Sequence, residues 1–578
     1  MVPLLSINNL SIQFKSETEL HTAVNNISFE IAAGELIAIV GESGSGKSIT
    51  ALSVLQLLPK QSTVSGEILF HQQETVDILK LSKKKINNIR GNKIAMIFQE
   101  PMTSLNPVFT CGYQVMESLQ LHKQLSKKIA RQETIKLFEK VQLPDPEILV
   151  DRYPHELSGG QKQRVMIAMA MCCNPALLIA DEPTTALDVT VQKKILQLIK
   201  SLQQPVLSDG QNNMGVIFIS HDLDVVSDIA DKILVMYKGE IVEQGNAKDI
   251  LFAPKHPYTK ALLACRPAAQ KKGTRLKVVS DFIEQPEISS VFFTQSEPLK
   301  TFTPPSLINN SFLQIENLKV HFPIKKNIFG SATEFFKAID DVSFTVAQGD
   351  IVGLVGESGC GKTTLGRTIL QLVKQTSGKI LLNGKDLSQI PSAALRNMRK
   401  DLQIVFQDPY GSLNPHINIG DAILEPLKVN GIFNNNKQRR EKVIELLEKV
   451  SLDTNFITRY PHQFSGGQRQ RICIARALAL NPSFLIFDES VSALDVSVQA
   501  QVLNLLTDLK MEFGFTAIFI SHNLSVVHYM CNRILVMYKG KIVENGDADQ
   551  VYHHPKNAYT QALLNAIPGK TGISLSSK

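Results

Sequence analysis

The chain has 578 residues, of which 43% are hydrophobic and 20% charged, and its formal net charge is +7. This composition is ordinary for a soluble protein, and the mild positive charge proves neither a nucleic-acid nor a membrane partner. The seven cysteines form no CxxC pair, which excludes a zinc-ribbon pattern or a disulfide framework and predicts reduced thiols. No apolar run reaches the roughly 18 residues that a spanning helix needs, and we expect no signal peptide at the N-terminus.

The first informative element is an apolar strand at residues 36–40, followed by the glycine loop GESGSGKS that begins at Gly41. Its glycines let backbone N–H groups converge on phosphate oxygens, and the next helix presents its N-terminus to the same oxygens. The pattern predicts a phosphate-binding loop in which Lys47 reaches the β- and γ-phosphates and Ser48 offers a hydroxyl to Mg²⁺.

Four further motifs follow in the same half. Gln99 comes after an apolar segment, and LSGGQ occupies residues 157–161. The next apolar strand ends in Asp181 and Glu182, and the strand after it leads to His221. An aspartate at a strand end beside a triphosphate is suited to hold Mg²⁺, and an adjacent glutamate can orient the attacking water.

All of these motifs recur in the same order in the second half. Lys362, Asp488 and His522 follow their counterparts by 315, 307 and 301 positions. This nearly constant offset predicts two homologous domains, residues 1–270 and 312–578. Residues 271–311 are rich in Pro, Ser, Thr and Asn, and we expect an extended, partly ordered linker there.

The alternation of apolar strands and helical segments predicts an α/β fold with mostly parallel sheets covered on both faces. In such sheets ligands bind at the carboxyl ends of the strands. The glycine loops, the acidic pairs and the histidines all follow strand ends, so we expect them to gather at one edge of each sheet.

With LSGGQ and its counterpart FSGGQ at residues 464–468, both halves resemble ATP-binding-cassette (ABC) ATPases. The resemblance covers essentially everything but the linker. It implies two tandem P-loop NTPase domains, each with a RecA-like, mostly parallel core, an antiparallel β subdomain and a helical subdomain that carries the signature motif. It also implies that ATP and Mg²⁺ bind at two sites, each completed head-to-tail by the signature motif of the opposite half.

The resemblance assigns roles residue by residue. The phosphate-loop positions are Gly41, Ser43, Gly44, Gly46, Lys47, Ser48, Ile49, Gly356, Ser358, Gly359, Gly361, Lys362, Thr363 and Thr364. The signature positions are Ser158, Gly159, Gly160, Gln161, Ser465, Gly466, Gly467 and Gln468. The catalytic positions are Glu182, Glu489, His221, His522, Gln99 and Gln407. The magnesium positions are Ser48, Gln99, Asp181, Thr363, Gln407 and Asp488. Asp188 and Asp495 match the D-loop, and Phe14 and Phe322 match the aromatic residue that stacks on adenine.

Two further segments in each half resemble the peptide/nickel importer subfamily. They are EPMTSLNP and DPYGSLNP after the two glutamines, and HPYTKALL and NAYTQALL near the domain ends. The resemblance implies a fused motor on the cytoplasmic face of the membrane, peripheral to two permease subunits or a permease dimer and served by an external substrate-binding protein. Tyr258 and Tyr559 in the last two segments are interpreted as packing residues. Because Cys265 stands alone in its region, no iron–sulfur cluster is expected.

The alternative class is a soluble twin-cassette ATPase that acts on ribosomes or nucleic acid. A translation factor of that class would have a long, charged, helical linker, and an excision-repair ATPase would have CxxC zinc pairs. Aromatic residues make up only 6% of the chain, which offers no evident stacking platform for bases, so no nucleic-acid partner is expected. The cargo is not encoded in these motifs.

The second glycine loop carries Cys360 where the first has Ser45. A position at a helix N-terminus, two residues before Lys362, favours a thiolate. The sequence therefore predicts selective alkylation of Cys360, and protection of its sulfur by ATP; the alternative is a small buried residue that the reagent does not reach.

Overall fold

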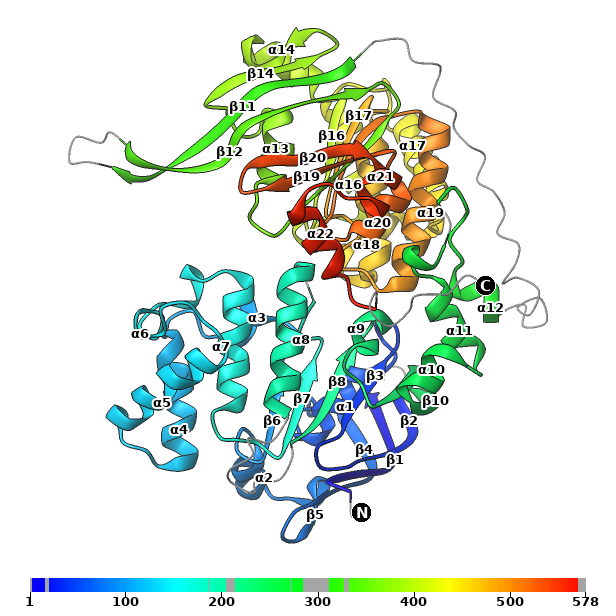
Figure 1. Ribbon diagram of the computed structural model, residues 1–578. Coiled ribbons are helices and arrows are strands. Elements are labelled where there is room, and N and C mark those ends of the chain that lie inside the picture. The colour runs from blue at the N-terminus through cyan, green and yellow to red at the C-terminus, as the bar shows by residue number, and fades with distance from the viewer. Residues whose placement is uncertain are drawn as a thin grey trace. The chain divides into compact units, whose positions relative to one another are not determined.

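The computed structural model (Figure 1) describes residues 3–15, 20–185, 187–203, 214–270, 272–283, 311–326 and 332–569. Its contacts divide the chain into two compact units. The first contains residues 1–263, 279–286 and 567–578, and the second contains residues 264–278 and 287–566. Within the expected linker 271–311, a short helix, α12, spans Val279–Ile283, and residues 284–310 lie outside the described part of the chain.

The first unit begins with an antiparallel sheet of strand order β2-β1-β4-β5. Its bounds are β1 Leu5–Lys15, β2 Leu20–Ile31, β4 Ser62–His71 and β5 Thr75–Asp77. Ile7 and Ile12 of β1 are fully buried and belong to a hydrophobic core that also contains residues of the second, six-stranded sheet. The antiparallel sheet is therefore packed onto the nucleotide-binding core that the sequence predicts.

The six-stranded sheet has the order β10-β9-β3-β8-β7-β6. Its strands are β3 Leu36–Val40, β6 Ile94–Ile97, β7 Leu177–Asp181, β8 Gly215–Ser220, β9 Lys232–Tyr237 and β10 Glu240–Asn246. Every pairing is parallel except that of β10 with β9. All residues of β3, β7 and β8 are buried, which explains why these strands read as continuous apolar runs.

The helices of this unit fall into two groups. Around the core lie α1 Lys47–Val54, α2 Lys83–Ile89, α8 Val189–Gln203, α9 Leu223–Ser227, α10 Ala247–Phe252 and α11 Pro257–Ala264. The inserted helical subdomain contains α3 Pro101–Ser104, α4 Cys111–Lys123, α5 Lys127–Lys140, α6 Pro146–Leu149 and α7 Gly159–Met171. The signature motif opens α7, as the sequence predicts.

The second unit repeats this architecture. Its antiparallel sheet has the order β12-β11-β14-β15, with β11 Ser311–Lys326, β12 Ala332–Ala347, β14 Ser377–Leu382 and β15 Lys385–Asp386. Its core sheet has the order β16-β17-β18-β13-β19-β20, with β13 Ile351–Val355, β16 Leu402–Val405, β17 Phe484–Asp488, β18 Thr516–Ile520, β19 Arg533–Tyr538 and β20 Lys541–Asp547.

The helices of the second unit also match the first. They are α13 Lys362–Ile369, α14 Ser392–Met398, α15 Pro409–Ser412, α16 Ile419–Val429, α17 Asn436–Lys449, α18 Gly466–Leu478, α19 Val496–Phe513, α20 Leu524–Met530, α21 Ala548–His553 and α22 Ala558–Asn565. Strands β11 and β12 are each 16 residues long, against 11 and 12 for β1 and β2. None of the described helices is long and apolar enough to cross a membrane. The tandem α/β fold expected from the sequence is confirmed.

Candidate functional site

Each glycine loop connects the central strand of its core sheet to a helix. In the first unit β3 ends at Val40 and α1 begins at Lys47, with Gly46 as the N-cap at φ 101°. A Cβ atom at Gly46 would lie 2.7 Å from the carbonyl oxygen of Ala23. Both the positive φ and the close approach of β2 therefore require glycine at this position.

The lysine of each loop is buried and hydrogen-bonded to the loop itself. Lys47 Nζ donates to the carbonyl oxygens of Gly41 and Glu42 at 2.7 and 2.8 Å. Lys362 Nζ makes the same two bonds, to Gly356 and Glu357, at 2.8 and 3.0 Å. Phosphate oxygens bind an ammonium group more strongly than neutral carbonyls do, so a triphosphate is expected to draw the lysine away from these carbonyls.

Beside each lysine, a hydroxyl and a buried carboxylate lie together. Ser48 Oγ donates to Asp181 Oδ1 at 3.0 Å, and Thr363 Oγ1 donates to Asp488 Oδ1 at 3.0 Å. Burial raises the pKa of Asp181 to about 6, and the charge of neighbouring Glu182 adds to the rise. The pKa of Asp488 is also raised, chiefly by burial. Hydroxyl and carboxylate oxygens are the ligands that Mg²⁺ prefers, and a cation here would favour the ionised carboxylate. The residues therefore fit a magnesium site.

Glu182 is the hub of the site, because three side chains donate to its Oε2 atom. Gln99 Nε2 lies 3.1 Å away, Thr185 Oγ1 2.9 Å and His221 Nδ1 3.1 Å. Gln99 lies 83 positions before Glu182 in the sequence and His221 lies 39 positions after it, and the structure brings all three together at one sheet edge.

Glu489 has the same role in the second unit. Gln407 Nε2 donates to its Oε2 at 2.9 Å, and His522 Nδ1 lies 3.5 Å from that oxygen. Lys362 Nζ is 3.7 Å from the other carboxylate oxygen. Both glutamates have positive φ values, 45° and 47°, so each stands in an uncommon backbone conformation directly after the strand that carries the aspartate.

The electrostatics of the two glutamates bear on catalysis. Burial alone would raise the pKa of Glu182, but the hydrogen bond from His221 and the charge of Lys47 lower it to about 2. The pKa of Glu489 is lowered by the corresponding groups against the same effect of burial. Each carboxylate is therefore held ionised, and its pKa would rise if the histidine and lysine turned towards a phosphate.

The two signature motifs form N-caps. Ser158 Oγ accepts from the backbone N–H of Gln161, and Gln161 Oε1 accepts from the N–H of Ser158, a reciprocal capping box. Ser465 and Gln468 repeat it at the start of α18. Each motif thereby presents a serine and several N–H groups at a helix N-terminus, which suits an anion. These hydrogen bonds lie within the motif's own turn and do not run to the phosphate loop of the same unit.

The predicted D-loop aspartates lie at helix starts, and the two phenylalanines expected to stack on adenine lie on strands. Asp188 Oδ1 accepts from the hydroxyl of Thr190 and from the N–H of Val191, at the start of α8. Asp495 is the N-cap of α19. Phe14 is partly buried and packs against the core of its own unit. Phe322 is 41% exposed and lies opposite Phe336 in the strand register. The adenine role of the two phenylalanines stays a prediction.

The expectation of a thiolate at Cys360 is wrong. This cysteine is only 7% exposed and belongs to the hydrophobic core of the second unit. Burial raises the pKa of its thiol by more than nearby Lys362 lowers it. Desolvation therefore outweighs the helix N-terminus and the lysine at this position.

The sequence interpretation missed one connection to the phosphate loops. The backbone N–H of Glu42 donates to the hydroxyl of Tyr258 at 3.0 Å, and that of Glu357 donates to Tyr559 at 3.0 Å. The packing role that the sequence predicts for both tyrosines does not include this bond. The signal was present in the sequence, since a tyrosine occupies the same place in the domain-end segments of both halves.

Together, the loops, carboxylates and histidines define a tandem P-loop ATPase with two equivalent sets of nucleotide-site residues. The ABC transporter family model matches residues 24–185 and 339–492, and the model of the oligopeptide/dipeptide transporter C-terminal region matches residues 242–288 and 543–572. The chain belongs to the ABC transporter family, as an ATP-hydrolysing motor subunit.

Curated relatives match along nearly the whole chain. The glutathione import ATP-binding protein GsiA of Pectobacterium atrosepticum is 44% identical over 570 residues, which cover 98% of this chain and 89% of that protein. Its namesake from Escherichia coli K12 is 46% identical over 574 residues with the same coverage. Among solved structures, a dimeric ATP-binding cassette with bound ADP and phosphate is 27% identical, with a TM-score of 0.37, and the match covers 41% of this chain and 98% of that one.

Proposed function

We propose that this chain powers import of a small peptide-like solute, such as glutathione, through membrane permeases served by an external binding protein. The supporting observation is the match to import ATP-binding proteins over 98% of the chain, which carries both sets of predicted nucleotide-site residues. The motor works at the cytoplasmic face of the membrane, peripheral to its permeases, and its cofactors are ATP and Mg²⁺.

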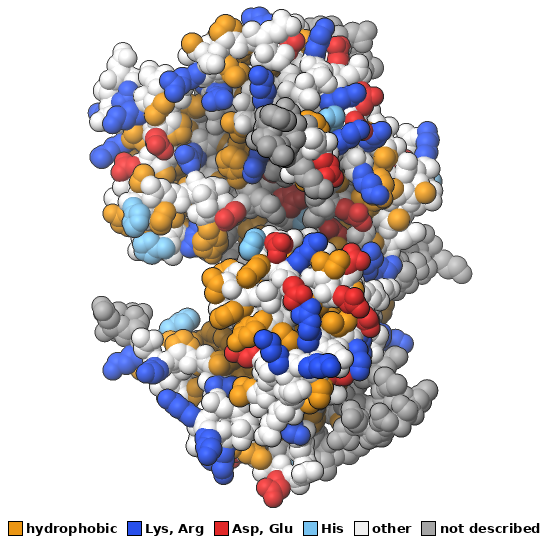
Figure 2. Space-filling model, turned by 90° about the vertical axis from the view of Figure 1, so that its left-hand side faces the viewer, with side chains coloured by type: hydrophobic (Ala, Val, Ile, Leu, Met, Phe, Trp, Pro, Cys, Tyr) orange, Lys and Arg blue, Asp and Glu red, His pale blue; other side chains and the backbone are white. Residues whose placement is uncertain are grey.

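An exposed apolar surface after Gln99 supports the permease contact. In the first unit Val108, Phe109 and Tyr113 are 69%, 44% and 41% exposed, and the two aromatic rings stack with centroids 4.9 Å apart. In the second unit Tyr410 is 65% exposed. Figure 2 faces the side on which α4, α5 and α6 lie in Figure 1, where hydrophobic side chains stand among Lys and Arg. Such residues suit the docking of a permease helix.

The resemblance to ABC ATPases implies that each nucleotide is held by residues of both halves. Lys47 and Ser48 bind the phosphates and the metal of one site, and Ser465 of the other half completes it. Lys362, Thr363 and Ser158 form the second site. Mg²⁺ bound beside these hydroxyls would supply charge neutralisation to the phosphate oxygens. Glu182 or Glu489 would orient the attacking water, and the histidine of the same unit would contact the γ-phosphate.

Purification from mildly solubilised membranes tests the proposal. Affinity-tagged full-length protein should recover two multi-span permease subunits or a permease dimer, identified by mass spectrometry. A matched variant, Val108→Asp with Tyr410→Asp, should recover much less permease while still binding ATP, because charge is introduced only on the exposed surfaces. Recovery of ribosomes or DNA-repair proteins in place of permeases would refute the proposal.

A further inference from the structure

The hydroxyl of a tyrosine in the C-terminal part of each unit holds the second residue of the phosphate loop. Tyr258 lies in the first turn of α11, and Tyr559 lies in the first turn of α22. Their hydroxyls accept from the N–H groups of Glu42 and Glu357, each at 3.0 Å. The same geometry occurs in two units whose sequences differ, which argues against a chance contact.

Each tyrosine ring is fixed by a second tyrosine at the end of the neighbouring strand. Tyr258 is fully buried, and its ring centroid lies 4.3 Å from that of Tyr237, the last residue of β9. Tyr559 and Tyr538 repeat this contact at 4.3 Å. Because the ring pair leaves the phenol little freedom, the hydroxyl is presented to the loop in one orientation.

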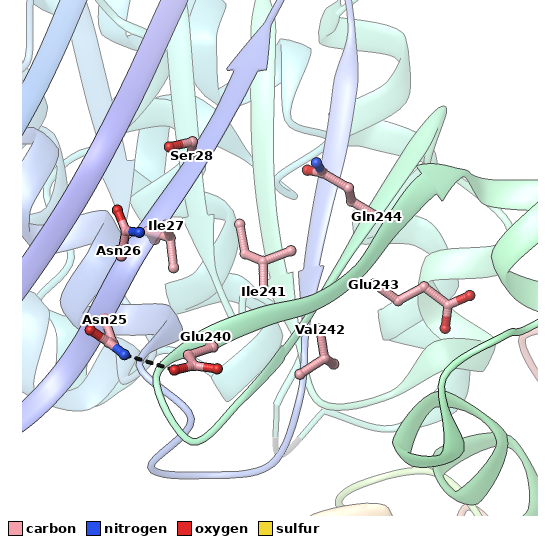
Figure 3. A pocket seen from close by; sticks show the side chains of 9 residues that line it. All are labelled: Asn25, Asn26, Ile27, Ser28, Glu240, Ile241, Val242, Glu243 and Gln244. Atoms are coloured by element: carbon pink, nitrogen blue, oxygen red, sulfur yellow. Dashed lines mark hydrogen bonds between the residues drawn. The ribbon is translucent and has the colours of Figure 1, made fainter.

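The backbone before each tyrosine is held by a carboxylate of the antiparallel edge strand. Glu243 of β10 accepts from the N–H groups of Lys255 and His256 at 2.7 and 3.0 Å. Figure 3 shows Glu243 among the residues that line a groove between β2 and β10, with its carboxylate turned away from Asn25 and Asn26. His256 Nδ1 in turn accepts from the N–H of Tyr258 at 3.2 Å.

The second unit has the same hydrogen-bond arrangement, with Asn557 in the place of His256. Glu544 accepts from the N–H groups of Lys556 and Asn557 at 2.7 and 3.2 Å. Asn557 Oδ1 then accepts from the N–H of Tyr559 at 2.8 Å. His256 in one unit and Asn557 in the other thus accept the same hydrogen bond from the tyrosine N–H. The series of hydrogen bonds from the edge strand to the tyrosine is therefore the same in both units, although this one residue differs.

The loop residue held by the tyrosine is one that also holds the lysine. The carbonyl oxygen of Glu42 accepts from Lys47 Nζ at 2.8 Å, while its N–H is bonded to Tyr258. Lys47 Nζ also donates to the carbonyl oxygen of Gly41, which lies in the same peptide as the Glu42 N–H. When phosphate oxygens draw the lysine away, the bond to the tyrosine still fixes this Gly41–Glu42 peptide. The loop backbone can then keep its conformation when Lys47 leaves the carbonyl oxygens and binds the phosphates. A loop that is already ordered lowers the entropy cost of nucleotide binding.

We propose that Tyr258 and Tyr559 are positioning residues of the two phosphate loops, and that the C-terminal region is thereby a working part of each nucleotide site. This inference rests on the proposed ATPase function. It assigns to the C-terminal region of each half a role in nucleotide affinity, exerted through the loop backbone without contact to ATP.

The test is the pair of substitutions Tyr258→Phe and Tyr559→Phe in the full-length protein, which keep both rings and remove only the hydroxyls. Loss of one hydrogen bond per site to a partly buried N–H should raise the Kd and KM for MgATP about three- to tenfold. The kcat at saturating MgATP should stay within about twofold, because the groups that act on the γ-phosphate are untouched.

The matched control is Tyr237→Phe with Tyr538→Phe, which removes a hydroxyl from the other ring of each pair and leaves the loop bond intact. Its Kd for MgATP should equal that of the wild type. If Tyr258→Phe with Tyr559→Phe lowers yield or the unfolding temperature, Glu243→Gln with Glu544→Gln provides a second test. Each of these glutamines keeps one acceptor oxygen and should give a smaller rise in Kd.

Wild-type affinity in the Tyr258→Phe and Tyr559→Phe protein, or an equal loss of affinity in the control, would overturn the positioning role. These outcomes differ from a failure of the proposed function, which would appear as wild-type protein that neither hydrolyses ATP nor recovers permeases.

Discussion

Substitution of the two hub glutamates probes the chemistry of the site most sharply. Glu182→Gln preserves the size of the side chain. The amide oxygen of the new glutamine can still accept from Gln99, Thr185 and His221, which all donate to a single carboxylate oxygen in the wild type. The fold and the nucleotide affinity should therefore survive, and only the charge that orients and polarises water is lost.

The expected cost follows from that single loss. A positioned general base typically contributes a factor of about 10²–10⁴ to the rate, which corresponds to about 3–5 kcal/mol of transition-state stabilisation. The double variant, with Glu489→Gln added, should lose turnover by this factor. Each single variant should lose the turnover of its own site, and the remaining rate reports how far one site works alone.

The assay is steady-state phosphate release by the full-length protein, with binding of MgATP measured in parallel. Unchanged binding with slow release confirms the role of the carboxylates. Gln192→Glu is a control for a change of charge near the site. Gln192 lies on α8 and donates to Thr184, but it is not hydrogen-bonded to the carboxylate of Glu182. Phosphate release at the wild-type rate by the double glutamine variant would refute the assignment of Glu182.

Three further outcomes are expected. Lys47→Ala with Ser465→Arg should hydrolyse ATP much as Lys47→Ala alone, whereas Lys47→Ala with Ser158→Arg should be clearly slower, because only the second pair damages both composite sites; equal rates would contradict head-to-tail pairing. The folded pKa of Asp181, about 6, is raised above its ordinary value, so its proton stabilises the nucleotide-free fold at low pH and that contribution is lost as the pH rises through about 6. Mg²⁺ must displace this proton, so Mg²⁺-dependent binding of an ATP analogue should weaken below pH 6, and a pH-independent affinity would count against the magnesium role. Cys360 should react slowly with N-ethylmaleimide in native protein and rapidly after unfolding, as peptide mapping can show; rapid labelling of the native protein would contradict its burial.

The sequence predicted the parts of the fold that repeat or that follow apolar strands. The carboxyl ends of β3, β7 and β8 meet at one edge of a parallel sheet, so the sequence predicts that Lys47, Asp181 and His221 lie close together. The chemistry of glycine loops and acidic strand ends then indicates the candidate site, because these motifs depend on local backbone geometry that the sequence encodes directly.

Two outcomes depended on packing that no local pattern encodes. The hydrophobic core around Cys360 raises the pKa of its thiol. Its position in the sequence, at a helix N-terminus and near Lys362, predicts a lowered pKa instead. Tyr258 meets Glu42 across 216 positions, and only the folding of α11 against the edge of the sheet brings them together. The tyrosine repeated in both halves marks the position, but periodicity and motif spacing do not reveal that its partner lies in the glycine loop.

ATP-driven uptake tests the central claim most directly. The complex of this chain with its co-purified permeases is placed in liposomes with ATP at the motor's side, and labelled glutathione and short peptides are offered at the other side with the binding protein. The account predicts uptake that requires MgATP and falls to background in the Glu182→Gln and Glu489→Gln variant. Uptake that is equal with wild-type and variant motor, or ATP hydrolysis without movement of any such solute, would contradict it.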